Sequence, residues 1–285
     1  MQSSPMPTTL RCGDKTLDLS RPVVMGVLNV TPDSFSDGGR FLPVEVAVAQ
    51  GLRLVEEGAA IIDIGGESTR PGAAPVSVEE ELRRVLPVVE RLRRATQAVI
   101  SVDTSKPEVI REAAAAGAGL INDVRALTET GALEAAAASD SAVCLMHMQG
   151  DPGTMQQAPS YVDVVKEVKA FLDERVQRCR AAGVSCDRIV IDPGFGFGKT
   201  LEQNLELLRR LRDLQGESPV LVGLSRKSMV GALTGRGTGD RVHGSIALAV
   251  IAAMNGARIV RAHDVAATVD ALKMVAAVAG SLNGS

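Results

Sequence analysis

The stretch AVISVDTSKPEVIREAAAAGAGLINDV, residues 98–124, contains the structural unit that repeats along this chain. Residues 99–103 and 119–123 are short runs that are mostly apolar on consecutive positions, which is typical of strands buried on both faces. Between them, Ser105 and Glu108 form an S-x-x-E capping box, which predicts the start of a helix. The stretch therefore predicts a strand, a helix and a second strand, arranged as a parallel βαβ unit.

The same unit recurs on both sides of this stretch. Further runs of strand type follow one another along the chain: 23–29, 60–65, 142–148, 188–192, 220–225 and 258–264. Helical patterns such as 78–94 and 162–181 lie between them, and two more capping boxes are present: Ser77 with Glu80, and Thr200 with Gln203. Eight strand–helix units in about 250 residues predict an α/β fold, a (β/α)8 TIM barrel. A doubly wound open sheet is the alternative.

A short hairpin is predicted ahead of the first barrel strand. TLRCGDKTLDL, residues 9–19, has strand-like segments on either side of Gly13-Asp14, and we expect it to cover the barrel floor. No low-complexity linker interrupts the chain, so we predict a single domain. Its parts are an N-terminal segment with the hairpin (1–22), the barrel (23–280) and a C-terminal tail (281–285).

The composition limits the classes of partner. The chain of 285 residues contains no Trp, one Tyr and five Phe, so its core must be mainly aliphatic and it lacks the stacking platforms of single-strand binders. Lys and Arg total 31 against 34 Asp and Glu, a net charge of -3, which is no electrostatic footprint for DNA or an anionic membrane. We therefore expect no nucleic acid and no membrane as partners.

The sequence also indicates a cytoplasmic protein. It has no run near the roughly 18 apolar residues that a membrane helix needs, and MQSSPMPTTL at its start lacks the pattern of a secretory signal. The cysteines form no CxxC pair and no disulfide framework: Cys12, Cys144, Cys179 and Cys186. They are expected to be reduced thiols, as is usual in the cytoplasm.

Polar side chains end nearly every predicted strand. In a TIM barrel these carboxyl ends form the rim that carries the active site. Asp103 and Asp192 are of special interest, because the helices that follow them are expected to be capped by Ser105 and Thr200 instead. Both carboxylates are then available for a ligand. The other residues expected on this rim are Asn29, Asn122, Asp123, Met146, His147, Lys227, Arg261 and His263.

Two rim segments differ from ordinary turns. Residues 29–39 (NVTPDSFSDGG) and 65–73 (GGESTRPGA) are rich in Gly, Ser, Thr, Asp and Pro, which suits loops that close over a ligand. Asn29, with nearby aspartates, is a candidate for seating Mg²⁺ through oxygen ligands and water. Positive charge for a phosphorylated or carboxylated ligand is expected on the same rim from Arg70, Lys227, Arg261 and His263.

Three common cofactor motifs are absent from the sequence. DPGFGFGKT (192–200) is not a P-loop, because only three residues separate Gly194 from Gly198 and Pro193 stands where a glycine is required. No G-x-G-x-x-G opens a helix after the first strand, and the histidines lack the spacing of zinc ligands on a helix. The residues alone thus predict a barrel enzyme with an acidic, amide-bearing pocket, an anion site and two mobile loops.

Eight motifs, in order along the strand ends, make the chain similar to a known family: NVTPDSFSDGG, DIGGESTRPGA, SVDTSKPEV, IND, LMHMQG, DPGFGFGK, GLSRKS and RAHD. From about Val23 onward the chain closely resembles bacterial dihydropteroate synthases. The resemblance implies a transferase that joins p-aminobenzoate to 6-hydroxymethyl-7,8-dihydropterin pyrophosphate, releasing pyrophosphate and making dihydropteroate for folate synthesis. It also implies Mg²⁺, a cytoplasmic homodimer and inhibition by sulfonamides, which mimic p-aminobenzoate.

The resemblance further implies a role for individual residues. The pterin site would consist of Asp103, Asn122, Met146, Asp192 and Lys227, of which Asp103, Asp192 and Lys227 would be catalytic. Pyrophosphate would lie against Asn29 through Mg²⁺, with Thr69, Arg70, Arg261, Ala262 and His263 around it. The p-aminobenzoate site would consist of Phe35, Pro71, Phe197 and Ser228. Phe35, Phe195 and Phe197 together would place half of the six aromatic side chains at the substrates.

The mechanism that the resemblance implies is dissociative. Pyrophosphate leaves first and a resonance-stabilised pterin cation remains, which the aspartates, Asp103 above all, would stabilise electrostatically. The one departure from the motifs is Ala262, where a β-branched residue is expected.

Two alternatives are weighed against the synthase. A folate-dependent methyltransferase on the same barrel would share the Asp/Asn pocket but should lack the Arg261-x-His263 pair and the NVTPDSF segment. A non-catalytic pterin-binding relative should have lost loop residues or Lys227. Both sets of residues are present, which favours the synthase.

Overall fold

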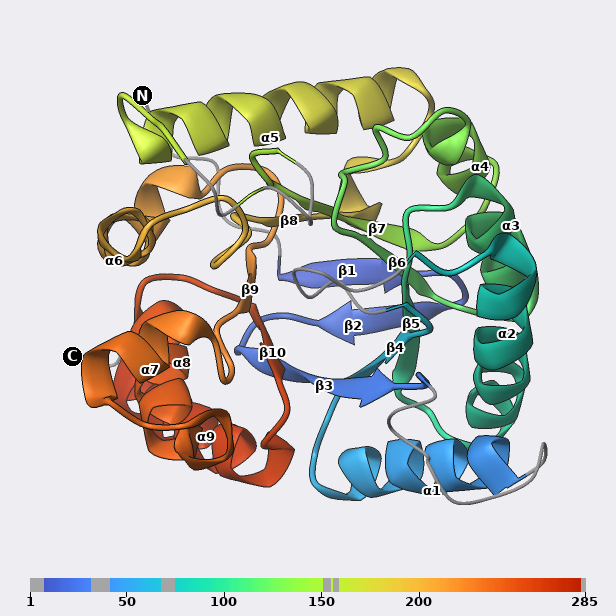
Figure 1. Cartoon of the computed structure of the whole chain (residues 1–285), viewed down its shortest axis with the longest axis horizontal. Coiled ribbons are helices and arrows are strands. Elements are labelled where there is room, and N and C mark those ends of the chain that lie inside the picture. The colour runs from blue at the N-terminus through green and yellow to red at the C-terminus, as the bar shows by residue number, and fades with distance from the viewer. Residues whose placement is uncertain (1–7, 32–41, 68–74, 151–154, 156–158, 283–285) are drawn as a thin grey trace.

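Eight parallel strands form the barrel in the computed structural model, which describes residues 8–31, 42–67, 75–150, 155 and 159–282 (Figure 1). They follow in the order β8-β7-β6-β5-β4-β3-β10-β9. The ring closes between β8 and β9, where Ile191 bridges Val220 and its N–H donates to the carbonyl of Pro219 at 3.1 Å. The TIM barrel is therefore confirmed and the open sheet is wrong. The strands are β3 (Val23–Asn29), β4 (Ile61–Gly65), β5 (Val99–Asp103), β6 (Leu120–Asp123), β7 (Ala142–Met146), β8 (Ile189–Asp192), β9 (Leu221–Gly223) and β10 (Ile259–Ala262).

Helices surround the strands on all sides of the view in Figure 1. The α-helices in the described part are α1 (Leu42–Glu56), α2 (Val78–Ala95), α3 (Pro107–Ala115), α4 (Ala132–Ala137), α5 (Val164–Ala181), α6 (Leu201–Arg209), α7 (Ser228–Thr234), α8 (Val242–Met254) and α9 (Val265–Leu282). Short 3₁₀ turns are η2 (Cys186–Arg188), η3 (Leu211–Leu214) and η4 (Thr238–Asp240). Every predicted strand is present. The runs at 142–148, 220–225 and 258–264 overestimate strand length, because their last residues leave the ladder for rim loops.

Two of the three predicted capping boxes cap a helix. The Ser77 hydroxyl accepts from the N–H of Glu80, and Thr200 forms a complete reciprocal box with Gln203. The box predicted at Ser105 is wrong: α3 begins at Pro107, and the side chain of its N-cap residue, Lys106, makes no capping hydrogen bond. Proline suits a first helical position because its missing N–H would have no partner there. Ser105 instead donates its hydroxyl to the carboxylate of Asp123.

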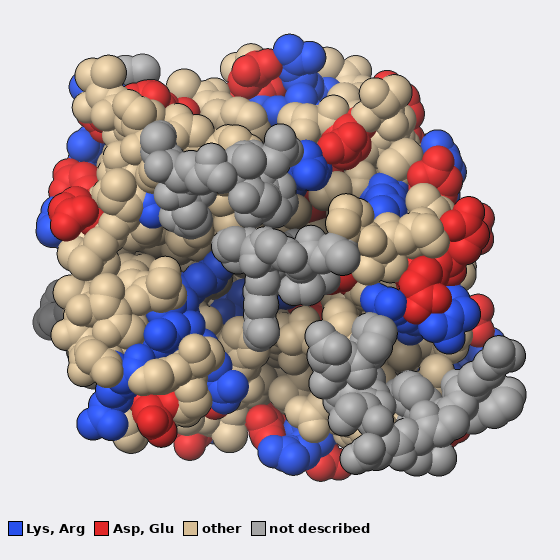
Figure 2. All heavy atoms as spheres, viewed as in Figure 1, with Lys and Arg blue, Asp and Glu red and all other residues tan. Residues whose placement is uncertain are grey.

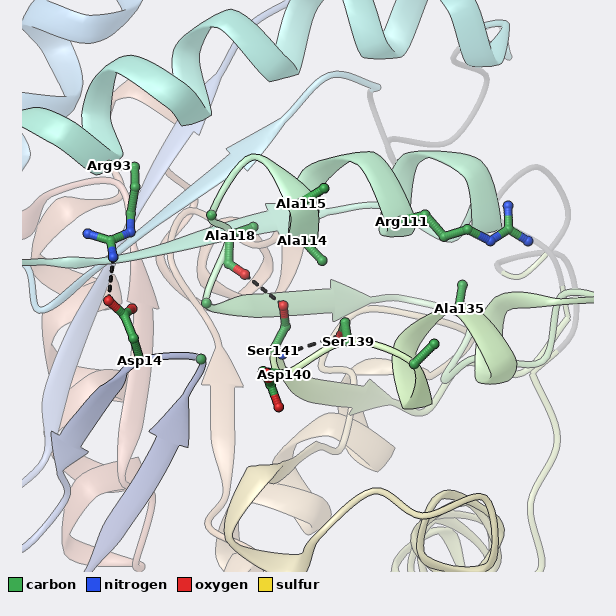
Figure 3. A pocket seen from close by; sticks show the side chains of 14 residues that line it. Asp14, Arg93, Arg111, Ala114, Ala115, Ala118, Ala135, Ser139, Asp140 and Ser141 are labelled. Carbon is green, nitrogen blue, oxygen red and sulfur yellow. Dashed lines mark hydrogen bonds and ion pairs between the residues drawn. The ribbon is translucent and has the colours of Figure 1, made fainter.

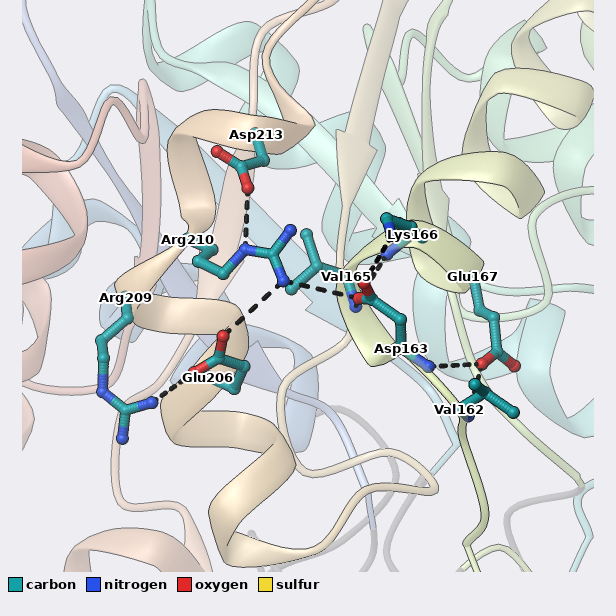
Figure 4. A network of polar contacts seen from close by, with 9 residues as sticks. All are labelled: Val162, Asp163, Val165, Lys166, Glu167, Glu206, Arg209, Arg210 and Asp213. Atoms are coloured by element: carbon teal, nitrogen blue, oxygen red, sulfur yellow. Dashed lines mark hydrogen bonds and ion pairs between the residues drawn. The ribbon is translucent and has the colours of Figure 1, made fainter.

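The start of α5 is set by a polar network that Figure 4 shows. The sequence pattern places the helix start at residue 162, but Asp163 is the N-cap, and its carboxylate accepts from the N–H groups of Val165 and Lys166 at 3.1 Å each. Arg210, at the end of α6, lies 3.5 Å from the same carboxylate and 2.8 Å from that of Asp213. These charges are partly exposed, so they orient α5 against α6 more than they stabilise the fold.

The barrel interior is apolar at its floor. All eight strands contribute buried apolar side chains to this layer: Met25, Ile61, Val99, Leu120, Ala142, Cys144, Val190, Leu221 and Ile259. The hairpin, β1 (Thr9–Cys12) and β2 (Lys15–Asp18), packs Leu10, Cys12 and Leu19 against this layer. A Cβ on Gly119 would lie 2.8 Å from the carbonyl oxygen of Cys12, so only glycine allows this approach. The predicted hairpin at the floor is confirmed.

A second core fills the space between the strands and the helices. It is built from Val, Leu, Ile and Ala side chains, as the composition requires, and it also contains Phe195, which is only 1% exposed. The expectation that Phe195 belongs to the substrate site is therefore wrong. Tyr161 and Phe171 pack against this second core, while the cysteines Cys12, Cys144, Cys179 and Cys186 are all free thiols. None of the described helices is long and apolar enough to cross a membrane.

A cavity of about 510 Å³ opens beside the hairpin at the floor, as Figure 3 shows. Its wall consists largely of Gly and Ala, from α3, α4 and the amino ends of β6 and β7. The Arg93 guanidinium at its edge pairs with Asp14 of the hairpin turn. With its charged groups already paired or at the edge, this cavity does not have the convergent polar groups of a ligand site.

Candidate active site

Above the apolar floor layer, the next inward side chains of β4, β5, β6 and β10 are polar and centre on Asp63 of β4. Asp63 is fully buried. Its Oδ1 accepts from the hydroxyl of Ser101 at 2.6 Å, and its Oδ2 accepts from Asn122 Nδ2 at 3.1 Å and from Arg261 Nε at 2.6 Å. One carboxylate thus holds side chains from β5, β6 and β10 at a single level of the barrel.

Arg261 links this level to Asp103 at the end of β5. A second guanidinium nitrogen, Nη2, donates to Asp103 Oδ2 at 3.1 Å. Burial, followed by repulsion from Asp63, raises the pKa of Asp103 to about 7, although Arg261 opposes the shift. Asp103 caps no helix, as the sequence predicts. The predicted reason, a cap at Ser105 that leaves Asp103 available, is wrong, because Ser105 does not cap α3.

Asp192, at the end of β8, is the second buried carboxylate of the rim. Burial raises its pKa to about 6, while the N–H of Gly194, Lys227 and Lys199 pull it down. Its Oδ1 accepts from Gly194 N at 2.7 Å. The expectation that this carboxylate is wholly available for a ligand is thus only partly correct, because one oxygen already holds the loop that follows β8.

Lys227 lies over the ring of Phe197. Its Nζ is 4.1 Å from the ring centroid, a cation–π distance. Burial, and then the Arg261 charge, lower the pKa of Lys227 to about 8, against the attraction of Asp192 and Asp103. In Figure 2, Lys and Arg side chains gather in a hollow near the centre of the face, over the part where Figure 1 draws β9 and β10. The predicted anion site therefore has positive charge in this region.

Further predicted residues lie on the same rim. Asn29 is exposed at the end of β3, in register with Gly65, which in turn pairs with Asp103. Met146 is buried and pairs with Asp192 across β7 and β8. His263, half-buried, has its Nδ1 3.1 Å from the hydroxyl of Ser225.

Other predicted residues are less well placed or lie outside the description. Ser228 is exposed at the first position of α7. Ala262 packs its methyl group in the core between the strands and the helices, so its main chain is the part left for the rim. Phe35, Thr69, Arg70 and Pro71 lie outside the described residues. Among the residues that are described, no group of three or more His, Cys, Asp or Glu side chains suits a metal ion.

Comparison with known proteins decides the family. The pterin binding enzyme family matches residues 25–263. Dihydropteroate synthase of Escherichia coli (strain K12) is 57% identical over 263 residues, covering 92% of this chain and 93% of that protein. The chain belongs to the dihydropteroate synthase family.

Solved structures of this family agree. The Xanthomonas albilineans dihydropteroate synthase with 4-aminobenzoic acid superposes with a TM-score of 0.89 at 57% identity, covering 95% of this chain and 98% of that one. The Yersinia pestis dihydropteroate synthase in a sulfonamide drug complex gives a TM-score of 0.91 at 54% identity, covering 95% and 99%. The identity to synthases over nearly the whole chain disfavours the methyltransferase alternative.

Two buried charged residues beside the candidate site, Asp63 and Lys199, are not among the residues that the sequence predicts. Asp63 is the only charged residue inside a strand otherwise made of apolar residues and glycine, and that contrast was the available signal. Lys199 ends the DPGFGFGK motif, is 3% exposed and lies against His147. Asp123, expected on the rim, instead accepts from the N–H groups of Arg125 and Leu127 and so supports its own loop.

Proposed function

We propose that this protein joins p-aminobenzoate to 6-hydroxymethyl-7,8-dihydropterin pyrophosphate, releasing pyrophosphate and forming 7,8-dihydropteroate. One observation carries the proposal: Asp103, Asn122 and Asp192 converge, buried, in the mouth of a barrel that also holds Lys227 and Arg261. The family membership supports the same reaction.

The buried polar groups match the chemistry of a pterin. A flat ring rich in nitrogen needs acceptors for its amino and N–H groups and donors for its carbonyl and ring nitrogens. Ionised Asp192 and Asp103 accept only, Lys227 donates only, and the Asn122 amide does both. Met146, buried next to Asp192 in the register, offers a polarisable surface for the ring. We propose these five residues as the pterin site.

The pyrophosphate is proposed to lie toward β3 and β10. Arg261 and His263 supply donors there, with Thr69, Arg70 and the main chain of Ala262 completing the set that the family resemblance implies. A Cβ on Gly65 would lie 3.6 Å from Asn29 Oδ1, so the glycine leaves this amide oxygen uncovered. Mg²⁺ binds one or two protein oxygens together with water and phosphate, and Asn29 fits that requirement. When bound, Mg²⁺ would neutralise charge on the leaving pyrophosphate.

The chain's own groups then favour a dissociative reaction. The bond between the pterin methylene carbon and the pyrophosphate oxygen breaks, and the electron pair leaves with pyrophosphate. Asp103 in its ionised form stabilises the pterin cation from within a buried site, where charge acts strongly. The amine of p-aminobenzoate forms the new C–N bond and loses a proton. Phe197 and Ser228, with Phe35 and Pro71, are proposed to hold the benzoate ring and its carboxylate.

The reaction is tested by the release of pyrophosphate. Protein supplied with Mg²⁺ and the pterin substrate is expected to release pyrophosphate continuously only when p-aminobenzoate is also present, with dihydropteroate detected by mass spectrometry. A sulfonamide should slow this release in competition with p-aminobenzoate. If no pyrophosphate is released with both substrates present, the chain is the non-catalytic pterin binder that the sequence left as an alternative.

We also propose that the protein works in the cytoplasm as a homodimer. Its cysteines are free and three of them are buried, as suits a reducing compartment. Helix α8 has no acidic or basic residue other than His243 and exposes Ile251 and Met254, while α9, packed beside it, exposes Met274 and Val278. Large exposed apolar side chains on neighbouring helices mark a protein interface.

The α8 and α9 surface gives a direct test of the dimer. Met254, which is 59% exposed, lies on this surface, and Met254→Glu places a charge there. Light scattering is expected to show the mass of a dimer, twice 29.8 kDa, for the unmodified protein and 29.8 kDa for the variant. Val46→Glu is the matched control, because Val46 is a similarly exposed apolar residue on α1. A monomeric unmodified protein, or a Met254→Glu variant that stays dimeric, would show that this surface is not the interface.

A further inference from the structure

Lys199 is a buried lysine that does not lie among the residues proposed to bind substrate. It follows the loop after β8, and its Nζ is 2.9 Å from the carbonyl oxygen of Gly194, 3.0 Å from that of Phe197 and 3.4 Å from that of His147. The same nitrogen lies 3.0 Å from His147 Nδ1. An ammonium group has three protons, so these four acceptors occupy it entirely within the chain.

His147 accepts from Lys199 as a neutral imidazole. Burial, followed by the Lys199 charge, lowers the pKa of His147 to about 3. Its ring packs edge-on against Phe171, with 5.0 Å between centroids. Because Nδ1 accepts from the ammonium, the ring proton lies on Nε2. Lys199 and His147 therefore form a hydrogen-bonded pair on the side of the loop that faces Phe171 of α5.

The loop after β8, residues 193–199, packs tightly against residues 147–149. Gly194 and Gly198 both have positive φ. A Cβ on Gly194 would lie 1.9 Å from the His147 carbonyl oxygen, and a Cβ on Gly198 would lie 2.4 Å from the Gln149 carbonyl oxygen. Only glycine permits this approach. The conformation turns the carbonyl groups of Gly194 and Phe197 toward one point, and a cation at that point is what balances their partial negative charges.

The opposite side of the same loop faces the proposed substrates. Gly194 N donates to Asp192, and the Phe197 ring lies under Lys227 Nζ. Within the loop, the N–H of Gly196 donates to Asn204 Oδ1 at 2.8 Å and the N–H of Phe197 donates to the Gly194 carbonyl oxygen at 3.1 Å. A shift of the loop would therefore move Phe197 directly, whereas Asp192 also remains anchored in β8.

We propose that Lys199 is a positioning residue that sets the place of Phe197, and with it the affinity for the arylamine substrate. The ammonium gathers the carbonyl groups of His147, Gly194 and Phe197, and the loop conformation that results presents the Phe197 ring to the pocket. The kinetic part of this inference rests on the proposed function; the structural part does not.

The test compares Lys199→Met, which keeps the stem but removes the charge and all donors, with Lys199→Gln, which retains donors. Lys199→Met is expected to raise the KM for p-aminobenzoate about 10- to 100-fold, and the KM for the pterin substrate much less, because a misplaced contact of about 1 Å has effects of that size. Lys199→Gln should lie between it and the unmodified protein. Lys169→Met, at an exposed α5 lysine paired with Asp173, is the matched control and should change neither KM.

A second measurement needs no substrate. The chain has three histidines, so ¹⁵N-histidine resonance spectra are simple enough to identify His147 with a His147→Gln variant. At pH 6, Lys199, whose pKa burial lowers to about 7, is mainly charged and His147 is neutral. The Nδ1 signal is expected to be that of an accepting nitrogen, and to shift in Lys199→Met.

The two measurements separate the possible failures. An Nδ1 signal that is the same in Lys199→Met overturns the Lys199–His147 contact, whether or not the protein is a synthase. A shifted Nδ1 signal with a KM for p-aminobenzoate within about twofold of normal would show that Lys199 only stabilises the loop. If Lys199→Met does not fold, Lys199→Gln is used for both measurements.

Discussion

Lys227→Met is expected to reduce kcat/KM by about a hundred- to a thousandfold while leaving the barrel as stable as before, or more stable. The loss follows because Lys227 supplies positive charge and donors beside Asp192 in a preorganised, largely dry site. The unchanged stability follows from the lowered pKa of Lys227, about 8, which shows that folding disfavours its charged form. Pyrophosphate release and thermal melting measure the two effects.

The control for Lys227→Met is Lys273→Met, which removes an exposed lysine of α9 that pairs with Asp270. It should keep both rate and melting temperature. A Lys227→Met variant with a near-normal rate would show that the pterin pocket has been misplaced. A variant with a greatly lowered melting temperature would instead make Lys227 a structural residue, with its activity loss secondary to unfolding.

Asp63→Asn is expected to damage both the fold and the reaction. The substitution removes the charge that Arg261 meets at 2.6 Å and places an amide where Ser101, Asn122 and Arg261 all need an acceptor. Leaving a buried charge without its partner costs about 3–5 kcal/mol of unfolding free energy. Because Asn122 and Arg261 lose their common anchor, turnover should fall as well. Urea unfolding and pyrophosphate release measure the two effects.

Asp173→Asn is the matched control, because Asp173 belongs to an exposed pair with Lys169 on α5. An exposed pair of this kind contributes about 0.3–0.5 kcal/mol, so the control should be close to the unmodified protein. If Asp63→Asn lost no more stability than Asp173→Asn, Arg261 would have to be held mainly by Asp103. Comparison with Asp103→Asn would then decide which carboxylate holds the guanidinium.

The fold was predictable because its signal is local and repeated. Apolar runs such as 99–103 end in a polar residue, and each is followed by a helical pattern, so a misjudged boundary changes little. The pattern runs on to residues 148, 225 and 264, but the strands end at Met146, Gly223 and Ala262, because a strand end depends on hydrogen bonds to neighbouring strands that a local pattern does not contain. His263 illustrates this: its N–H donates to the Ser225 hydroxyl instead of a neighbouring strand.

The individual contacts of the site were less predictable, since they join residues far apart in the chain. Asp63 holds Arg261 across almost two hundred positions, and no local pattern announces that pair. Ser105 shows the reverse case, because its local sequence pattern is that of a capping box. In the structure its hydroxyl donates to the buried carboxylate of Asp123 instead of capping the helix. Residues assigned through the family motifs, such as Asp103, Asn122 and Lys227, do lie together on the rim.

The hairpin against the barrel floor determines by which end substrates enter and products leave the barrel. With Leu10, Cys12 and Leu19 packed under the lowest interior layer, the barrel has one open end among the described strands. Both substrates must then enter, and both products leave, by the same mouth. Since Asn122 and Asp63 lie deeper than Phe197 of the rim loop, an arylamine already seated would stand in the path of an arriving pterin. With the pterin site placed as proposed, the pterin must therefore enter the barrel before p-aminobenzoate.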